Sequence, residues 1–170
     1  MEEISLDEFL LLFPEHRRAF HLEMKEEYHV EEEDEEFSRF LAGEIREPDW
    51  GSDWRDHIRD AATAGCAMQR VRIVSEPLND YARFLLAHAA GSVAAGEDIR
   101  YLPRDKTAGI DLPVEDCWLF DDSKLILVLF PGDGRRYGMH PVDDPELTAC
   151  YVAVRDQVWE RAIPYTEYAG

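Results

Sequence analysis

The sequence predicts an α/β (α+β) fold: a mixed sheet of about five strands with one parallel β-α-β crossover, an antiparallel meander and flanking helices. Three observations lead to this prediction. Between residues 68 and 102, an apolar run, an amphipathic helical pattern and a second apolar run follow one another, which is typical of a parallel crossover. Between residues 117 and 142, three strand-like runs are separated by turn residues. Hydrophobic residues make up 45% of the 170 residues, enough for a substantial core.

The first 50 residues are predicted to be an acidic, helical N-terminal segment of a single domain, 1–170. Residues 6–13, LDEFLLLF, are a candidate for a short amphipathic helix. Residues 16–28 are ambiguous, because apolar residues alternate there as in a strand while a helix is also compatible. Six consecutive acids, residues 31–36, lead into a helix with apolar residues at i, i+3 and i+4. A loop with Pro and Gly then separates this segment from an α/β core at 51–170.

The core begins with a helix at 54–64, followed by a strand, MQRVRIVS, from residue 68. A helix is predicted from residue 78 to about residue 90, where Gly91 would close it. The strand IRYL, residues 99–102, completes the crossover, and its connection should be right-handed.

The second half of the core is predicted to be the meander and a closing helix. CWLFD at 117–121 and KLILVLF at 124–130 are two strands, and the continuous apolar run of the second suits a strand covered on both faces. A GDG turn at 132–134 leads to RRYGMHPV at 135–142. A final helix begins at Pro145 and ends before residue 164.

The charge distribution narrows the possible functions. The formal net charge is −19, and residues 1–50 carry −12 of it. A chain with a pI near 4.5 offers little basic surface for phosphates, so direct nucleic-acid binding is not expected. The sequence has no apolar run of membrane-spanning length, so no membrane partner is expected either. Three widely spaced cysteines without a metal-binding pattern are consistent with a cytoplasmic location. Two of them, Cys66 and Cys117, lie in or beside apolar runs and are expected to be buried.

The carboxyl ends of the parallel strands are the expected place for a ligand, because open α/β sheets bind there. We expect Ser75–Pro77 and Gly96–Arg100 to meet in one neighbourhood, either as a polar pocket or as a network of salt bridges in which Glu76 pairs with Arg100. Arg70, Arg72, Arg83 and Arg100 alternate with apolar positions and could offset nearby carboxylates. The candidate ligand-binding residues are Ser75, Glu76, Asp80, Arg83, Glu97, Asp98, Arg100 and Arg104.

No motif assigns catalytic residues, a metal site or a cofactor. The sequence contains no GxSxG, HExxH, P-loop or GxGxxG. The acid pairs Asp121-Asp122 and Asp143-Asp144 do not have the spacing of a calcium loop, and turn or capping roles are favoured for them.

Several strings resemble the actinobacterial family DUF6879, whose function is uncharacterised. They are AFHLEMKEEY, WRDHIRDAATAG, RVRIVSEPLNDYARFLL, AAGEDIRYLPRD, DCWLFD and VWERAIPYTEY. The resemblance covers about residues 13–168. It implies a small single-domain protein with an accessory role beside helix-turn-helix regulators. An aromatic residue typical of the family is replaced by Cys117.

The strand-helix-strand unit followed by WLFDD also resembles half of a phospholipase D-like domain. Chemistry in that superfamily depends on an HxK motif, and no His in this chain is followed two residues later by Lys. The resemblance therefore implies a degenerate fold used for binding.

Besides a plain stability or assembly role through dimerisation, which would appear as a large apolar patch, two functions remain open from the sequence. The first is a non-enzymatic, cytoplasmic binding or regulatory module that engages a basic protein partner or a transcription regulator. Its candidate partner-binding residues are Glu31, Glu32, Glu33, Asp34, Glu35 and Glu36. The second is a small-molecule sensor or enzyme with a polar pocket at the strand ends.

Overall fold

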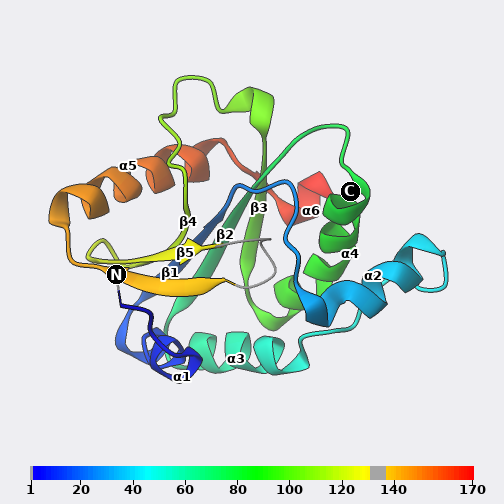
Figure 1. The fold of residues 1–170 in the computed structure, drawn as a ribbon, viewed down its shortest axis with the longest axis horizontal. Helices are drawn as coiled ribbons and strands as arrows, with labels where there is room; N and C mark the ends of the chain where they lie inside the picture. The colour runs from blue at the N-terminus through cyan, green and yellow to red at the C-terminus, as the bar shows by residue number, and fades with distance from the viewer. Residues whose placement is uncertain (1, 131–136) are drawn as a thin grey trace.

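A computed structural model describes residues 2–130 and 137–170, and its centre is a seven-stranded mixed sheet with the order β6-β5-β4-β1-β2-β3-β7 (Figure 1). The strands are β1 (Arg18–Glu23), β2 (Ala67–Val74), β3 (Asp98–Pro103), β4 (Asp116–Phe120), β5 (Lys124–Leu129), β6 (Gly138–Val142) and β7 (Ile163–Pro164). The α-helices are α1 (Leu6–Leu10), α2 (Asp34–Leu41), α3 (Ser52–Thr63), α4 (Asp80–Ala95), α5 (Pro145–Arg161) and α6 (Tyr165–Tyr168). Three short 3-10 turns lie at η1 (Phe13–Glu15), η2 (Glu31–Glu33) and η3 (Arg104–Lys106).

The predicted crossover is confirmed. Strands β2 and β3 are parallel neighbours, with Gln69 opposite Asp98 and Val74 opposite Pro103, and α4 connects them. The meander is confirmed as well, since β4, β5 and β6 pair antiparallel in sequence order. The predicted GDG turn at 132–134 lies outside the described residues.

The ambiguous stretch at 16–28 contains β1, which is the central strand of the sheet. It pairs parallel with β2 and antiparallel with β4. Together with the two-residue strand β7, it raises the strand count from the expected five to seven. The description of residues 1–50 as a helical segment apart from the core is therefore wrong, because the middle of the sheet is formed by residues 18–23.

Helix α4 is longer than the sequence predicted. It runs through Gly91 to Ala95, and Gly96, with φ of +121°, occupies its C-cap. A Cβ atom at Gly91 would lie 3.2 Å from Cδ of Arg55 on α3. The glycine at this position therefore allows a close approach of α3 and does not end the helix.

The sheet separates two layers, as Figure 1 shows, with α5 on one face and α1, α3 and α4 on the other. Alternate residues of β1 and β2, such as Leu22, Val71 and Ile73, point to the α5 face and form its apolar core. On the other face, the apolar core includes Phe13 and Ile58. Helix α2 packs outside α4, with its aromatic residues near Phe84.

Candidate functional site

A layer of buried charges lies on the sheet face that α3 and α4 cover. It comes from alternate positions of the two central strands: His21 and Glu23 on β1 lie opposite Arg70 and Arg72 on β2. The residues between them carry the apolar core of the α5 face, so these polar residues must face the other way. Glu97, the residue directly before β3, also belongs to the layer, because it accepts a hydrogen bond from Arg70.

The four charged groups of the layer form one continuous chain of ion pairs. Glu97 accepts a hydrogen bond from Nε of Arg70 at 2.7 Å, and an Nη atom of Arg70 donates to Oε1 of Glu23, also at 2.7 Å. The second oxygen of Glu23 accepts from Nε of Arg72 at 2.6 Å. Two carboxylates thus match two guanidinium groups, and the arginines lower the pKa of Glu23 against the effect of burial.

His21 belongs to this layer as a neutral side chain. Burial lowers its pKa to about 3, and Arg70 and Arg72 act in the same direction against the opposing effect of Glu23. The ring stacks on Trp118 with centroids 4.2 Å apart. Its Nδ1 lies 3.5 Å from Oε1 of Glu23 and makes no hydrogen bond among the described residues. His21 is therefore unable to serve as a cation in the layer near neutral pH.

Two buried carboxyl groups border the layer, each bonded to a tyrosine. Asp116 accepts from the Tyr28 hydroxyl and from the backbone N–H of Met24, and burial raises its pKa to about 6. Glu33 accepts from the Tyr81 hydroxyl at 2.6 Å, and burial raises its pKa to about 7. Glu33 belongs to the acidic run, so this bond ties the run to the interior.

The other acids of the run lie further out. Glu31, Glu32, Asp34 and Glu35 are exposed. Glu36 is half-buried, pairs with Arg39 at 3.4 Å and accepts from the backbone N–H of Asp49. The run therefore combines an internal anchor at Glu33 with an outward acidic surface.

The eight candidate ligand-binding residues do not gather in one pocket. At the carboxyl ends of β2 and β3, Ser75 donates to Glu26 at 2.5 Å, and Arg104 reaches the same carboxylate oxygen at 3.0 Å. Glu76 accepts from the Tyr168 hydroxyl at 3.1 Å. At the start of α4, Asp80 and Arg83 pair with each other.

The remaining three candidates lie at the opposite end of the crossover. Asp98 pairs with Arg100 at 3.2 Å, and Arg100 lies over the ring of Trp159 at 3.8 Å. Glu97 pairs with Arg70 in the buried layer. The prediction that Ser75–Pro77 and Gly96–Arg100 lie in one neighbourhood is wrong, and so is the predicted ion pair between Glu76 and Arg100. In a parallel pair, the start of one strand lies beside the start of its neighbour, so the end of β2 and the start of β3 are separated by the length of the strands.

Comparison with known families bears on the resemblance seen in the sequence. The model of DUF6879, described as a domain of unknown function, matches residues 7–170. The chain belongs to the DUF6879 family. No curated protein sequence matches this DUF6879 member significantly.

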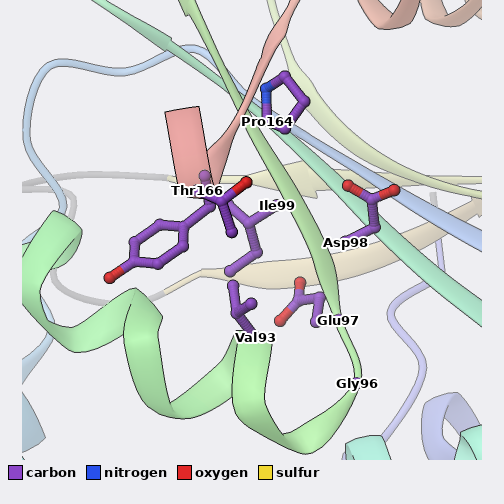
Figure 2. A pocket seen from close by; sticks show the side chains of 8 residues that line it. Val93, Gly96, Glu97, Asp98, Ile99, Pro164 and Thr166 are labelled. Carbon is purple, nitrogen blue, oxygen red and sulfur yellow. The ribbon is translucent and has the colours of Figure 1, made fainter. Parts of the chain in front are cut away.

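A hollow of about 280 Å³ opens in this DUF6879 member at the amino end of β3, between the last turn of α4 and the C-terminal residues (Figure 2). Its lining includes Val93, Glu97 and Ile99 on one side and Pro164, Tyr165 and Thr166 on the other. A second cavity, of about 10 Å³, lies at the carboxyl end of β2 beside Arg72, Tyr28 and Tyr81. It has room for about one water molecule.

The sequence analysis missed two acids: Glu23, which pairs with Arg70 and Arg72 on β2, and Glu26, which pairs with Arg104 just after β3. It correctly expected Arg70, Arg72, Arg83 and Arg100 to offset carboxylates, and all four do so. A usable signal for Glu23 is present: it alternates in phase with His21 in a run whose other positions are apolar.

Neither a metal cluster nor a membrane span is found in the described part of this DUF6879 member. Residues 2–130 and 137–170 contain no group of three or more His, Cys, Asp or Glu side chains placed to hold a metal ion. Within the same ranges, every helix is too short or too polar to cross a membrane.

Proposed function

We propose that this DUF6879 member is a non-enzymatic binding module that engages a basic protein partner, such as a helix-turn-helix regulator, through the acidic run at residues 31–36. One observation carries the proposal: a buried acid attaches the run to the protein interior, while other acids of the run carry their charge at the surface. Glu33 is 5% exposed and bonded to Tyr81. Three acids of the run that face solvent are Glu31, Glu32 and Glu35.

The packing of α2 supports a fixed presentation of these charges. Phe37 packs edge-on against Tyr81, and Phe37 and Phe40 both contact the ring of Phe84 on α4. A charged surface that is already ordered loses less conformational entropy on binding than a flexible tail does. Its field also speeds the encounter with a basic surface, and salt weakens that effect.

The rival function, a sensor or enzyme with a polar pocket at the strand ends, gains no such support. Each of its eight candidate residues already has a hydrogen-bond or ion-pair partner among the described residues. Paired side chains of this kind orient loops, and among these eight residues Glu97 alone has a buried side-chain oxygen, Oε2, without a hydrogen-bond partner in the described part of the chain.

A cytoplasmic location is part of the proposal. It is supported by the three free thiols, of which Cys66 and Cys117 are buried, as expected, and Cys150 is exposed. Reduced cysteines are typical of the cytosol.

The proposal is tested with a charge-matched pair of variants. The first carries Glu31→Gln, Glu32→Gln and Glu35→Gln, which leaves the anchoring Glu33 unchanged. The control carries Asp111→Asn, Asp143→Asn and Glu160→Gln, three exposed positions away from α2 with the same change in net charge. Both sets avoid buried groups, so both variants should fold.

Each protein is immobilised and used to capture partners from a cell extract at low salt, and each captured protein is then purified and titrated. We expect the wild type and the control to bind the same basic protein, and the run variant to bind it at least about tenfold more weakly. Binding should also weaken as salt rises toward about 0.5 M. A partner bound equally well by the run variant would contradict the proposal.

A further inference from the structure

The hollow at the amino end of β3 has a lining that suits a small organic molecule, with apolar walls and carboxylates. Its volume of about 280 Å³ is just below the range of about 300–1,000 Å³ for pockets that hold drug-sized ligands. Val93, Ile99, Pro164 and the ring of Tyr165 supply apolar walls. Among the described residues, two carboxylates, from Glu97 and Asp98, are the charged side chains of the lining.

Glu97 has a hydrogen-bonding oxygen that the described residues leave unused. The residue is 2% exposed, and its Oε1 accepts from Arg70, but its Oε2 has no partner. A buried acceptor without a partner costs about 1–3 kcal/mol, and more when it is charged. In Figure 2 the carboxylate of Glu97 points to the same side of β3 as Val93, while Asp98 points to the other side.

The electrostatics of the hollow favour a positively charged donor. The last turn of the 16-residue helix α4 borders it at Val93 and Gly96, and the carboxyl end of a helix carries partial negative charge. Asp98 lies at the rim with Arg100 as its partner, and Arg70 is shared between Glu97 and Glu23. An ammonium group donates charge-assisted hydrogen bonds, which are stronger than neutral ones.

We infer that this hollow binds a small aliphatic amine in its protonated form, with its ammonium group donating to Oε2 of Glu97 and its alkyl chain against Val93, Ile99 and Tyr165. The Oε2 atom of Glu97 is hidden from solvent in the structure. The amine therefore enters by a side-chain movement at the rim, where Tyr165 is half-buried and Thr166 is exposed. Rotamer changes of this kind are common on binding.

The inference is tested with n-butylammonium, and with n-butanol and butyrate as neutral and anionic probes of similar shape. Backbone amide spectra of the full chain are recorded during each titration at about 150 mM salt. We expect n-butylammonium to shift the signals of Val93, Gly96, Ile99 and Thr166. n-Butanol should bind at least about tenfold more weakly, and butyrate should not bind.

Two variants keep the test independent of the buried ion pairs. Thr166→Trp fills the hollow from an exposed position and should weaken n-butylammonium binding at least about tenfold. Glu167→Trp changes the next residue, which is exposed and outside the lining, and should leave the affinity unchanged. The inference is overturned if Thr166→Trp binds like the wild type or if n-butanol binds equally well. Shifts confined to residues 31–36, or no shifts at all, would overturn it too. None of these results bears on partner binding by the acidic run, because both variants leave that run intact.

Discussion

The face of the sheet under α5 and the face under α4 are built from alternate residues of the same strands, yet their chemistry differs. Under α5, Leu22 and Val71 pack into an apolar core. Under α4, the neighbouring positions Glu23, Arg70 and Arg72 are also buried or nearly so, but they are charged. The apolar face is stabilised by removal of area from water. The charged face is tolerated only because each charge has its counter-charge on an adjacent strand.

The difference shows that burial alone does not decide whether a strand residue is apolar or charged. Buried ion pairs often stabilise a fold no more than apolar residues of similar volume would. The charged face therefore contributes through the sites next to it and not through stability. It borders Glu33, the anchor of the acidic run, and at its far end Glu97 lines the hollow.

The largest expected effect comes from removing the carboxylate that both arginines share. Glu23→Gln leaves Arg72 buried without an anionic partner, and we expect it to lower the free energy of unfolding by about 3–5 kcal/mol. Glu26→Gln is the matched control at the exposed end of the same region, where Glu26 pairs with Arg104. It should cost less than about 1 kcal/mol. Urea unfolding of the two variants measures both values, and equal losses would show that the charges of the buried layer do not depend on their partners more than an exposed pair does.

The next effect is a pH dependence set by Glu33. Because the pKa of Glu33 is raised to about 7 in the folded state, the folded chain holds the carboxyl proton of Glu33 more tightly than the unfolded chain does. The free energy of unfolding should therefore fall as pH rises from about 5 to about 8, and Asp116, with its pKa raised to about 6, acts in the same direction.

The variant Glu33→Gln isolates the contribution of this residue, since its amide oxygen can still accept from Tyr81. We expect its loss of unfolding free energy over that pH range to be smaller than that of the wild type by about 2–3 kcal/mol. The measurement is urea unfolding at both pH values. A variant with the same pH slope as the wild type would show that Glu33 is not the group that titrates.

The smallest effect belongs to the ion pairs on the surface. Asp80 and Asp98 are exposed and pair with Arg83 on α4 and Arg100 on β3. We expect Asp80→Asn and Asp98→Asn each to change the free energy of unfolding by less than about 1 kcal/mol. Thermal unfolding suffices to check this, and a loss as large as that of Glu23→Gln would remove the distinction between the exposed pairs and the buried layer.

Much of the fold could be predicted from the sequence because strong patterns coincide with the elements. The apolar runs of β2, β3 and β5 and the turn residues around α5 indicate their elements correctly. Strand β1 was ambiguous for a physical reason: His21 and Glu23 alternate with apolar residues, which is typical of a strand with one solvated face. An ion-paired buried face has the same pattern, and only the partner strand shows which one is present.

The candidate site was predicted less completely. Glu97 was identified as a candidate, but it was grouped with Ser75 at the wrong end of the crossover. The register of β2 and β3 separates these two residues by the length of a strand. Glu33 was expected to face a partner together with its neighbours, whereas Tyr81 holds it inside. Both differences depend on tertiary pairing, which a single sequence does not show.

The central claim is that the charges on the α4 face act as one neutral unit, and a double-mutant cycle of Glu23→Gln and Arg72→Met tests it most directly. If the two side chains stabilise each other, the double variant will be less destabilised than the sum of the single variants, with a coupling of about 2 kcal/mol or more. Additive losses of unfolding free energy would contradict the claim and show that each charge is accommodated independently of the other.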